Sequence, residues 1–518
     1  MQFFAFKLRP LTRFAGLLCF AAILLFCTTR PIKSGDFVEY CLTTIAFATH
    51  GTPYVTLSDV EHAIALSSEE GYRGMFMVIR ENMLAGHEAP MPGQLRSRHG
   101  HYLTLHFFAY PALAALPFRI FEAAGIDPFK AYQLVNYAPL LAVGLACRLL
   151  FGSGRRAGLA LALFLLCGAL RYLNWCSPEV FTTASLLAGL VLCTIGRPIA
   201  AAILAGVAAM QNPPLIAFGV FAPALRVGWL MAAEQLAPAA ALRAVACALQ
   251  LTLAIVPVLF SLWQFGEPSM IAKLATDPAL VGSERLRSFF FDPNQGAIVA
   301  CPALILLLAW LLWQRRGQRP LWHLAPVLGL TLALALPSLA TGNWNSGAAG
   351  PMRYVVWGVA PLLYLALAWL AQQRRWPPLL LGTVLALQGA AMLHARSYHH
   401  LEFSPLGAWV LRTAPGWYDP DPELFLERVV HRDGAVREDG VIAYPNADRP
   451  LKTLYNARNR EATLALCGPG RRLLDDDVVQ MAQGWRYINS APRCAAVNLD
   501  PGLRAEAPGG ASGRPVVH

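Results

Sequence analysis

The sequence predicts an all-α polytopic membrane protein with a small α+β domain outside the membrane at its C-terminal end. Three observations predict this fold class. Of the 518 residues, 56% are hydrophobic and only 14% are charged, whereas a soluble domain carries about 25% charged residues. Apolar runs recur along most of the chain, and about eleven of them approach the length of a membrane span. Basic residues gather in alternate loops between these runs.

The apolar runs are predicted membrane spans. A span needs about 20 residues, or somewhat fewer when the helix is short. The first run follows basic residues and lacks a small-residue cleavage site, so we expect an uncleaved helix rather than a signal peptide. Pro213 and Pro214 fall between two short runs, which form either one broken span or two. The expected spans lie near residues 14–30, 131–151, 156–174, 179–196, 198–211, 213–227, 241–264, 297–314, 321–340, 353–372 and 377–394.

Loop charges predict the orientation. With the N-terminus in the cytoplasm, every short basic loop falls on the cytoplasmic side, as the positive-inside rule requires. The net charge of +11 then reflects topology and headgroup contact. No nucleic-acid motif accompanies it. We therefore predict a multi-pass protein of the bacterial cytoplasmic (inner) membrane with a periplasmic C-terminal domain. The basic loops contain Arg155 and Arg156, Arg197, Arg226 and Arg243, Arg315, Arg316 and Arg319, and Arg374 and Arg375.

Within the predicted transmembrane domain, residues 1–394, one outer loop is too long to be a simple connector. It covers residues 31–130, and long loops in membrane proteins are often functional. Its stretch 101–122 is interrupted by Pro111 and Pro117, so we expect an amphipathic helix in the outer interface rather than a span.

The polar tail, residues 395–518, is the predicted extracytoplasmic domain. The runs GVIAY and ATLALC are strand-like, and APGGASGRP indicates disorder from about residue 501. If the tail lies outside, Cys467 and Cys494 could pair as a disulfide.

The stretch SGDFVEY, residues 34–40, places two carboxylates just beyond the first predicted span. Asp36 and Glu39 share a face if this stretch is helical. A carboxylate at this depth is costly unless it is solvated, paired or functional. It could be a general base or a metal ligand at the mouth of a membrane cavity. Alternatively, Asp36 caps the N-terminus of a helix. The spacing leaves both interpretations open.

The stretch RSRHGHY brings Arg98, His99 and His101 to the predicted outer face. Positive charge there runs against the orientation rule, and binding of an anion such as a lipid phosphate would explain it. Contact with lipid headgroups is the alternative. Two histidines two residues apart do not share a helix face, so this pattern is weak evidence for a metal site.

Two predicted spans begin on the outer face with a charged residue. Arg353 follows the loop 341–352 and could hold an anion, or it could reach from the span to the interface. Glu179 follows Ser177 and Pro178, which suit a helix start. It could equally face a substrate.

Over about residues 14–394 these segments together resemble the GT-C superfamily of polytopic glycosyltransferases, such as protein O-mannosyltransferases and aminoarabinose transferases of lipid A. Members of that family carry an acidic motif in the first outer loop, often Asp-Glu-x-x-Tyr. Asp36 and Tyr40 keep its spacing here, Phe37 stands at the second position, and the nearest acid is Glu39. Other blocks similar in place are RHGHYLTLHFFAYPALAALPFRIFEAAG, SPEVFTTASLL, FFFDPNQGAIVACPALILLL and WNSGAAGPMRYVVWGVAPLLYL.

The resemblance implies transfer of a sugar, with inversion, from a polyprenyl-phosphate donor to an acceptor on the outer face of the membrane. It implies that Asp36, together with Glu39, is the base or the carboxylate that positions the acceptor. The donor phosphate would be held by Arg353 and by the region of Arg98 and His99. Further candidates for substrate binding are Tyr40, His101 and Glu179.

The partners that the resemblance implies are the lipid-linked donor, a lipid, polysaccharide or protein acceptor, and membrane lipids, without nucleic acid. The resemblance does not imply a particular cofactor. Some relatives use a divalent metal ion, for which this sequence shows no evident ligand set.

Two other function classes remain open. A transporter or flippase of lipid-linked glycans would be expected to carry internal repeats and polar residues within its spans, and neither is clear here. A non-catalytic membrane scaffold of the cell envelope would present the tail to a partner.

Overall fold

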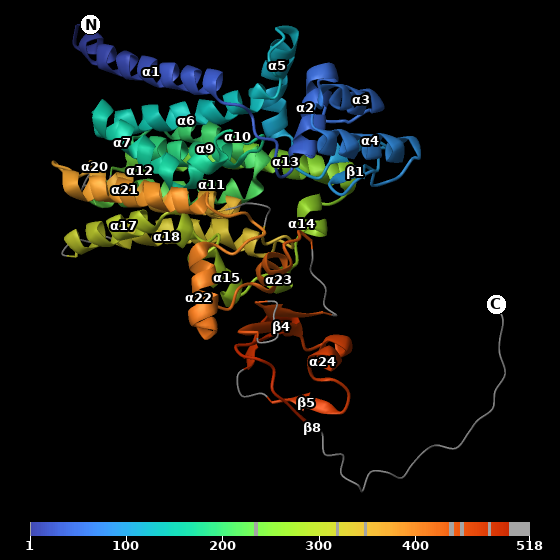
Figure 1. Ribbon diagram of the computed structural model, residues 1–518. Helices are drawn as coiled ribbons and strands as arrows, with labels where there is room; N and C mark the ends of the chain where they lie inside the picture. Colours follow the sequence, from blue (N-terminus) through green and yellow to red (C-terminus); the bar gives the residue numbers. More distant parts are fainter. Residues whose placement is uncertain are drawn as a thin grey trace. The chain divides into compact units, whose positions relative to one another are not determined.

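The computed structural model describes residues 2–232, 237–316, 321–345, 350–434, 440–445, 450–474 and 478–496. These residues are mostly helical, with few strands. The chain divides into two compact units, Met1–Ala408 and Trp409–His518 (Figure 1). The predicted disordered end, from about residue 501, lies outside the described residues.

The first unit contains the apolar helices. Some of them are joined by short turns, several of which are 3-10 or π-helical, and others by longer segments. The elements are α1 (Gln2–Thr28), α6 (Lys130–Phe151), α7 (Gly154–Phe164), η1 (Leu165–Ala169), α8 (Leu170–Tyr172), α9 (Glu179–Thr194), α10 (Pro198–Gln211), η2 (Pro213–Ile216), α11 (Ala217–Ala232), α12 (Pro238–Val245), η3 (Ala246–Leu249), α13 (Gln250–Phe265), α16 (Ala297–Ala300), α17 (Pro302–Gln314), α18 (Leu321–Leu339), α19 (Arg353–Gly358), α20 (Ala360–Ala371) and α21 (Pro378–Ala395).

Shorter elements lie between these helices. The predicted outer loop, residues 31–130, folds into helices and one hairpin, and further short helices follow α13 and α21. They are α2 (Phe37–His50), α3 (Leu57–Leu66), α4 (Glu70–Leu84), β1 (Gln94–Arg96), β2 (Tyr102–Thr104), α5 (Ala109–Ala123), α14 (Met270–Leu274), η4 (Pro278–Leu280), α15 (Ser283–Phe291) and α22 (Pro405–Thr413).

Within the described residues, six helices are long and apolar enough to cross a membrane. They are Pro10–Thr28, Lys130–Phe151, Pro213–Met231, Pro238–Phe265, Arg353–Ala371 and Pro378–Ala395. Shorter apolar helices accompany them at Glu179–Thr194, Pro198–Gln211, Pro302–Gln314 and His323–Leu339. This arrangement is that of an all-α membrane protein, but the predicted count of about eleven spans is not confirmed.

The run predicted as one span at 156–174 is not a continuous helix. α7 ends at Phe164 and a π-helical turn follows, in which Gly168 has a φ of 102°. Such a turn frees backbone groups that need partners in an apolar environment. Gln388 of α21 supplies one, because its amide donates to the carbonyl oxygen of Leu166 at 3.0 Å.

The stretch 101–122, predicted as one interfacial helix, is helical only from Ala109. Its first residues instead form β2, which pairs with β1 as an antiparallel hairpin. α5 lies across the direction of α6 in Figure 1, and its residues Leu113, Leu116 and Ile120 are exposed. An exposed apolar face on such a helix suits a membrane interface.

The second unit is an α+β fold. A four-stranded antiparallel sheet has the order β3 (Val441–Tyr444), β4 (Lys452–Asn456), β7 (Trp485–Ile488) and β6 (Val478–Gln480). β5 (Arg471–Leu473) pairs with β8 (Cys494–Ala496). The remaining elements are η5 (Pro415–Trp417), α23 (Pro422–Val430), α24 (Arg460–Cys467) and η6 (Ala482–Gly484).

Two expectations for this unit have definite outcomes. The disulfide between Cys467 and Cys494 is present. GVIAY contains a strand, but ATLALC is helical and not a strand. The Asn459 side chain accepts hydrogen bonds from the amides of Glu461 and Ala462, and such an N-cap favours a helix in the alanine- and leucine-rich residues that follow.

Candidate functional site

Asp36 stands at the N-cap position of α2, but its side chain makes no capping hydrogen bond. Its carboxylate instead pairs with Arg353, whose Nη1 donates to Oδ2 at 2.7 Å. Gly35 precedes it with a φ of 60°, which glycine adopts without strain. A Cβ on Gly35 would lie 3.5 Å from Arg353 Nη1. The local chain is therefore shaped to bring this arginine and carboxylate together.

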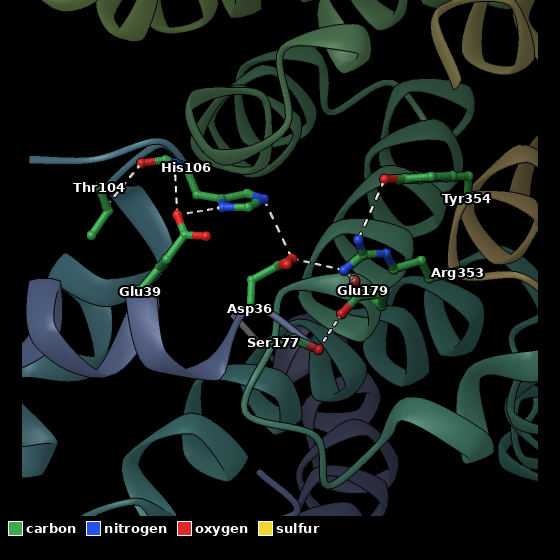
Figure 2. Close-up of polar contacts among 8 residues, drawn as sticks. All are labelled: Asp36, Glu39, Thr104, His106, Ser177, Glu179, Arg353 and Tyr354. Atoms are coloured by element: carbon green, nitrogen blue, oxygen red, sulfur yellow. Dashed lines mark hydrogen bonds and ion pairs between the residues drawn. The ribbon is translucent and has the colours of Figure 1, made fainter. Parts of the chain in front are cut away.

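Glu39 lies one turn further along α2, on the same side as Asp36. Its Oε2 accepts a hydrogen bond from Nδ1 of His106 at 2.8 Å. The other ring nitrogen of His106, Nε2, lies 3.3 Å from Asp36 Oδ2. A single imidazole thus bridges the two carboxylates (Figure 2). His106 comes from the loop between β2 and α5, so the hairpin determines its position.

Arg353 joins this group to a third carboxylate. Its Nη1 lies 3.8 Å from Oε1 of Glu179, the first residue of α9. The Ser177 hydroxyl donates to the other oxygen of Glu179. The Tyr172 hydroxyl donates to the carbonyl of Pro351 at 2.6 Å and so holds the segment that precedes Arg353. We name Asp36, Glu39, His106, Glu179 and Arg353 the charged cluster.

The charged cluster is largely withdrawn from solvent. The Arg353 side chain is 13% exposed and that of Glu179 is 8% exposed. Three carboxyl groups face one guanidinium and one imidazole, so full ionisation of all five groups leaves one uncompensated negative charge. Ionised groups at this burial persist only when they are paired. The pairing therefore offsets most of the cost of burying these ionisable side chains.

The pKa values of Asp36, Glu39 and His106 are shifted in different directions. Burial raises the pKa of Asp36, but the charges of Arg353 and His106 outweigh burial and lower it to about 2. Burial also raises the pKa of Glu39, and His106 offsets this only in part, so that it stays above its usual value. Burial lowers the pKa of His106, but Glu39 and Asp36 raise it to about 9. At neutral pH Asp36 is therefore ionised and His106 is protonated.

Gly93 fixes the position of Glu39. It precedes β1 with a φ of 92°, and its carbonyl accepts from the amide of Leu105, next to His106. A Cβ on Gly93 would lie 2.3 Å from Glu39 Oε1. Only glycine permits both this conformation and this close approach.

The structure brings Asp36, Glu39, Glu179 and Arg353 together, and Tyr40 borders them. The Tyr40 ring is buried and meets the His106 ring edge-on, with centroids 5.5 Å apart. Tyr40 therefore contacts the imidazole that bridges the two carboxylates.

Arg98, His99 and His101 lie instead at the tip of the β1–β2 hairpin. Arg98 Nε donates to the carbonyl of Trp263 at 2.7 Å, and His99 Nε2 lies 3.0 Å from the same oxygen. His101 stacks on Tyr54, with ring centroids 4.1 Å apart. No contact among the described residues joins these three to Asp36 or Arg353. Arg98 and His99 therefore attach the hairpin to the C-terminal end of α13.

Sequence reasoning missed His106, Ser177 and Gly93 as site residues. His106 is 67 residues from Glu39, so no local spacing connects the two. The available signal was a histidine in a stretch of the outer loop otherwise dominated by apolar residues. Ser177 was considered only as part of a helix start.

A divalent cation is compatible with part of the charged cluster. Ligand atoms of Asp36, Glu39 and His106 lie within 4.8 Å of one another, and two carboxylates with an imidazole suit zinc or manganese. Arg353 already occupies Asp36 Oδ2, and the protonated His106 offers no lone pair. These residues could therefore hold a metal ion only after Arg353 turns away and His106 loses its proton.

The chain has no match in comparisons with known protein families, with characterised proteins and with solved structures.

Proposed function

We propose that the protein is a membrane glycosyltransferase that transfers a sugar from a polyprenyl-phosphate donor to an acceptor at the outer face of the membrane. The observation that carries this proposal is the direct contact between Asp36 and Arg353, which are 317 residues apart. The contact places a cation suited to a lipid phosphate beside a carboxylate suited to an acceptor hydroxyl. The chain-long resemblance to GT-C enzymes is the second support.

Arg353 is the donor-phosphate ligand in this proposal. A guanidinium forms charge-assisted hydrogen bonds with phosphate oxygens in a fixed fork. When the bond between the sugar C1 and the phosphate oxygen breaks, negative charge grows on the leaving lipid phosphate. A cation already in place stabilises that charge without reorganisation.

Asp36 is the proposed base. The acceptor hydroxyl attacks C1 from the face opposite the phosphate, its proton passes to Asp36, and polyprenyl phosphate leaves, so the configuration at C1 inverts. A carboxylate with a pKa near 2 is a weak base. Because Arg353 contributes to that low pKa, its engagement with the donor phosphate raises the basicity of Asp36 when the donor is bound.

Glu39 and His106 have a positioning role in this scheme. The protonated imidazole bonds to both carboxylates and holds Asp36 in one orientation. A divalent cation held by Asp36, Glu39 and His106, if bound, would supply additional positive charge against the donor phosphate.

The test compares product formation in variants of the charged cluster with product formation in variants of an exposed ion pair. Asp36→Asn and Arg353→Gln are introduced into a host that lacks the endogenous gene, and the glycans of lipid, polysaccharide and protein fractions are profiled. Glu61→Gln and Arg80→Gln disrupt an exposed ion pair of the same loop and are the controls. We expect both site variants to accumulate in the membrane and to lose the product by at least about 100-fold, while the controls retain it.

The same experiment separates the other function classes. A glycan profile that is unchanged in Asp36→Asn would contradict the proposal and favour a scaffold. A product that forms normally while lipid-linked sugar accumulates on one leaflet would indicate a transporter.

A further inference from the structure

An open cavity with a volume of about 580 Å³ lies against the N-terminal half of α1. The end of α6 and the start of α7 complete its walls. Arg13, on its rim, precedes Thr28 at the end of α1 by 15 residues, which is about 22 Å along a helix. The cavity therefore lies at the other end of α1 from Asp36 and is separate from the charged cluster.

Three arginines line this cavity. Arg13 belongs to α1, Arg148 to the last turn of α6 and Arg155 to the first turn of α7. Of the described residues that line the cavity, none is acidic. None of the three guanidinium groups has a hydrogen bond or ion pair with another described residue. The three positive charges therefore remain available to a ligand.

The first turn of α7 adds backbone donors to the same cavity. Ser153 caps this eleven-residue helix by accepting from the amide of Arg156. Gly154 and Arg155 line the cavity, and their backbone amides have no acceptor among the described residues. Free amides at a helix N-terminus favour a phosphate or a carboxylate.

The apolar side of the cavity is open to lipid. Pro10, Phe14 and Leu17 of α1 form it, and Leu17 is 68% exposed. No residue in the most apolar window of the candidate span Pro10–Thr28 is buried inside the protein. A soluble anion would leave this apolar wall in water, whereas a lipid chain would cover it.

Glycines allow α1 to close one side of the cavity. A Cβ on Gly144 of α6 would lie 2.6 Å from Leu18 Cδ1, and one on Gly154 would lie 3.2 Å from Phe14 Cδ2. Small residues at such positions let membrane helices approach closely. Arg13, near the start of one candidate span, and Arg148, near the end of the other, are thereby brought to the same cavity. The ends of membrane spans lie at headgroup depth, where a phosphate group would be found.

We propose that this cavity binds the phosphate headgroup of an anionic membrane phospholipid, with an acyl chain along α1. The loop charges assign this end of the helices to the cytoplasmic leaflet. The volume falls within the range of about 300–1,000 Å³ that is typical of small-molecule sites. Basic pockets between membrane helices are suited to such headgroups.

The test uses the full chain purified in detergent and titrated with phosphatidylglycerol or phosphatidylcholine, with native mass spectrometry as the readout. We expect phosphatidylglycerol to bind at least about tenfold more tightly than phosphatidylcholine, as expected for a cluster of arginines facing an anionic lipid. Arg148→Gln/Arg155→Gln should lose that preference. Arg374→Gln/Arg375→Gln removes the same charge from another predicted cytoplasmic loop and should keep it.

The unfolding temperature of the same samples is measured to exclude the possibility that Arg148→Gln/Arg155→Gln loses lipid binding because it is misfolded. Binding to the native state raises the unfolding temperature, so phosphatidylglycerol should stabilise the wild type and the control but not Arg148→Gln/Arg155→Gln. Equal binding of the two lipids would overturn the proposal, as would unchanged preference in Arg148→Gln/Arg155→Gln. Displacement of phosphatidylglycerol by inorganic phosphate at equal concentration would overturn it too, because it would identify a site for a soluble anion.

Discussion

The charged cluster and the hairpin tip both contain an arginine that the sequence associated with a donor phosphate, yet the two use their cations differently. Arg353 faces the side chains of Asp36 and Glu179, which are themselves ionisable. Arg98 donates to the backbone carbonyl of Trp263 at the end of α13. A carboxylate partner can change its protonation state or accept a substrate proton, whereas a carbonyl can do neither. The two arginines carry the same charge, so it is the partner that distinguishes them. Arg353, with carboxylate partners, is a candidate for chemistry, whereas the contact of Arg98 with a carbonyl is structural.

The largest expected effect is on the pair Asp36–Arg353. Either Asp36→Asn or Arg353→Gln leaves a partly buried charge with its main partner removed, and we expect a loss of about 3 kcal/mol in the free energy of unfolding. The double variant should be destabilised by less than the sum of the two, while product formation is lost in all three. Chemical denaturation in detergent and the glycan profile measure these quantities. Strict additivity would show that the two side chains do not interact.

Gly93→Ala should give the next largest effect. The new Cβ displaces Glu39 from His106, and a displacement of this size near reacting groups lowers activity by about 10- to 100-fold. Gly100→Ala is the matched control, because Gly100 also has a positive φ, 82°, and its added Cβ meets only Arg96 Nη2, at 3.9 Å. Both variants carry the same kind of backbone strain, so only Gly93→Ala should reduce product. Equal loss in both would assign the effect to the hairpin rather than to Glu39.

A smaller and pH-dependent effect is expected for His106→Gln. The pKa of His106 is raised to about 9 in the fold, so its ion pairs stabilise the protein fully below the unfolded value of about 6.5. This contribution is lost as the pH rises through 9. The difference in unfolding temperature between the wild type and His106→Gln should therefore be largest at about pH 6 and shrink by about pH 10. A difference independent of pH would mean that His106 acts only by packing.

The smallest effect is expected for Arg98→Gln. Its loss removes one hydrogen bond to Trp263, which amounts to about 1 kcal/mol of stability, and leaves the charged cluster intact. Product formation should stay within about threefold of the wild type, measured beside Arg353→Gln in the same host. A loss comparable to that of Arg353→Gln would support the prediction that both arginines hold the donor phosphate.

Parts of this arrangement could be predicted from sequence because membrane spans limit where polar groups can go. Asp36, Glu179 and Arg353 each stand at the end of an apolar run that the sequence assigns to the outer face, so their convergence follows from the expected orientation of those runs. His106 could not be predicted in the same way. Its partners lie in another helix, and a hairpin within a stretch expected to be helical sets its position.

The incorrect expectations have local physical causes. Hydropathy cannot detect the break at Gly168, because the residues on both sides are apolar and the partner Gln388 lies far along the chain. The run ATLALC was predicted to be strand-like, but the side chain of Asn459 caps a helix there. In both places a polar side chain satisfies backbone groups that the apolar pattern does not reveal.

The β1–β2 hairpin has a mechanical consequence. Its tip is attached to the last carbonyls of α13 through Arg98 and His99, and its base runs into His106. The ladder of hydrogen bonds between the strands makes it stiff over about 10 Å. The hairpin therefore connects the end of α13 to the loop that contains His106 as one stiff element. The position of His106 relative to Glu39 thus depends on where the end of α13 lies.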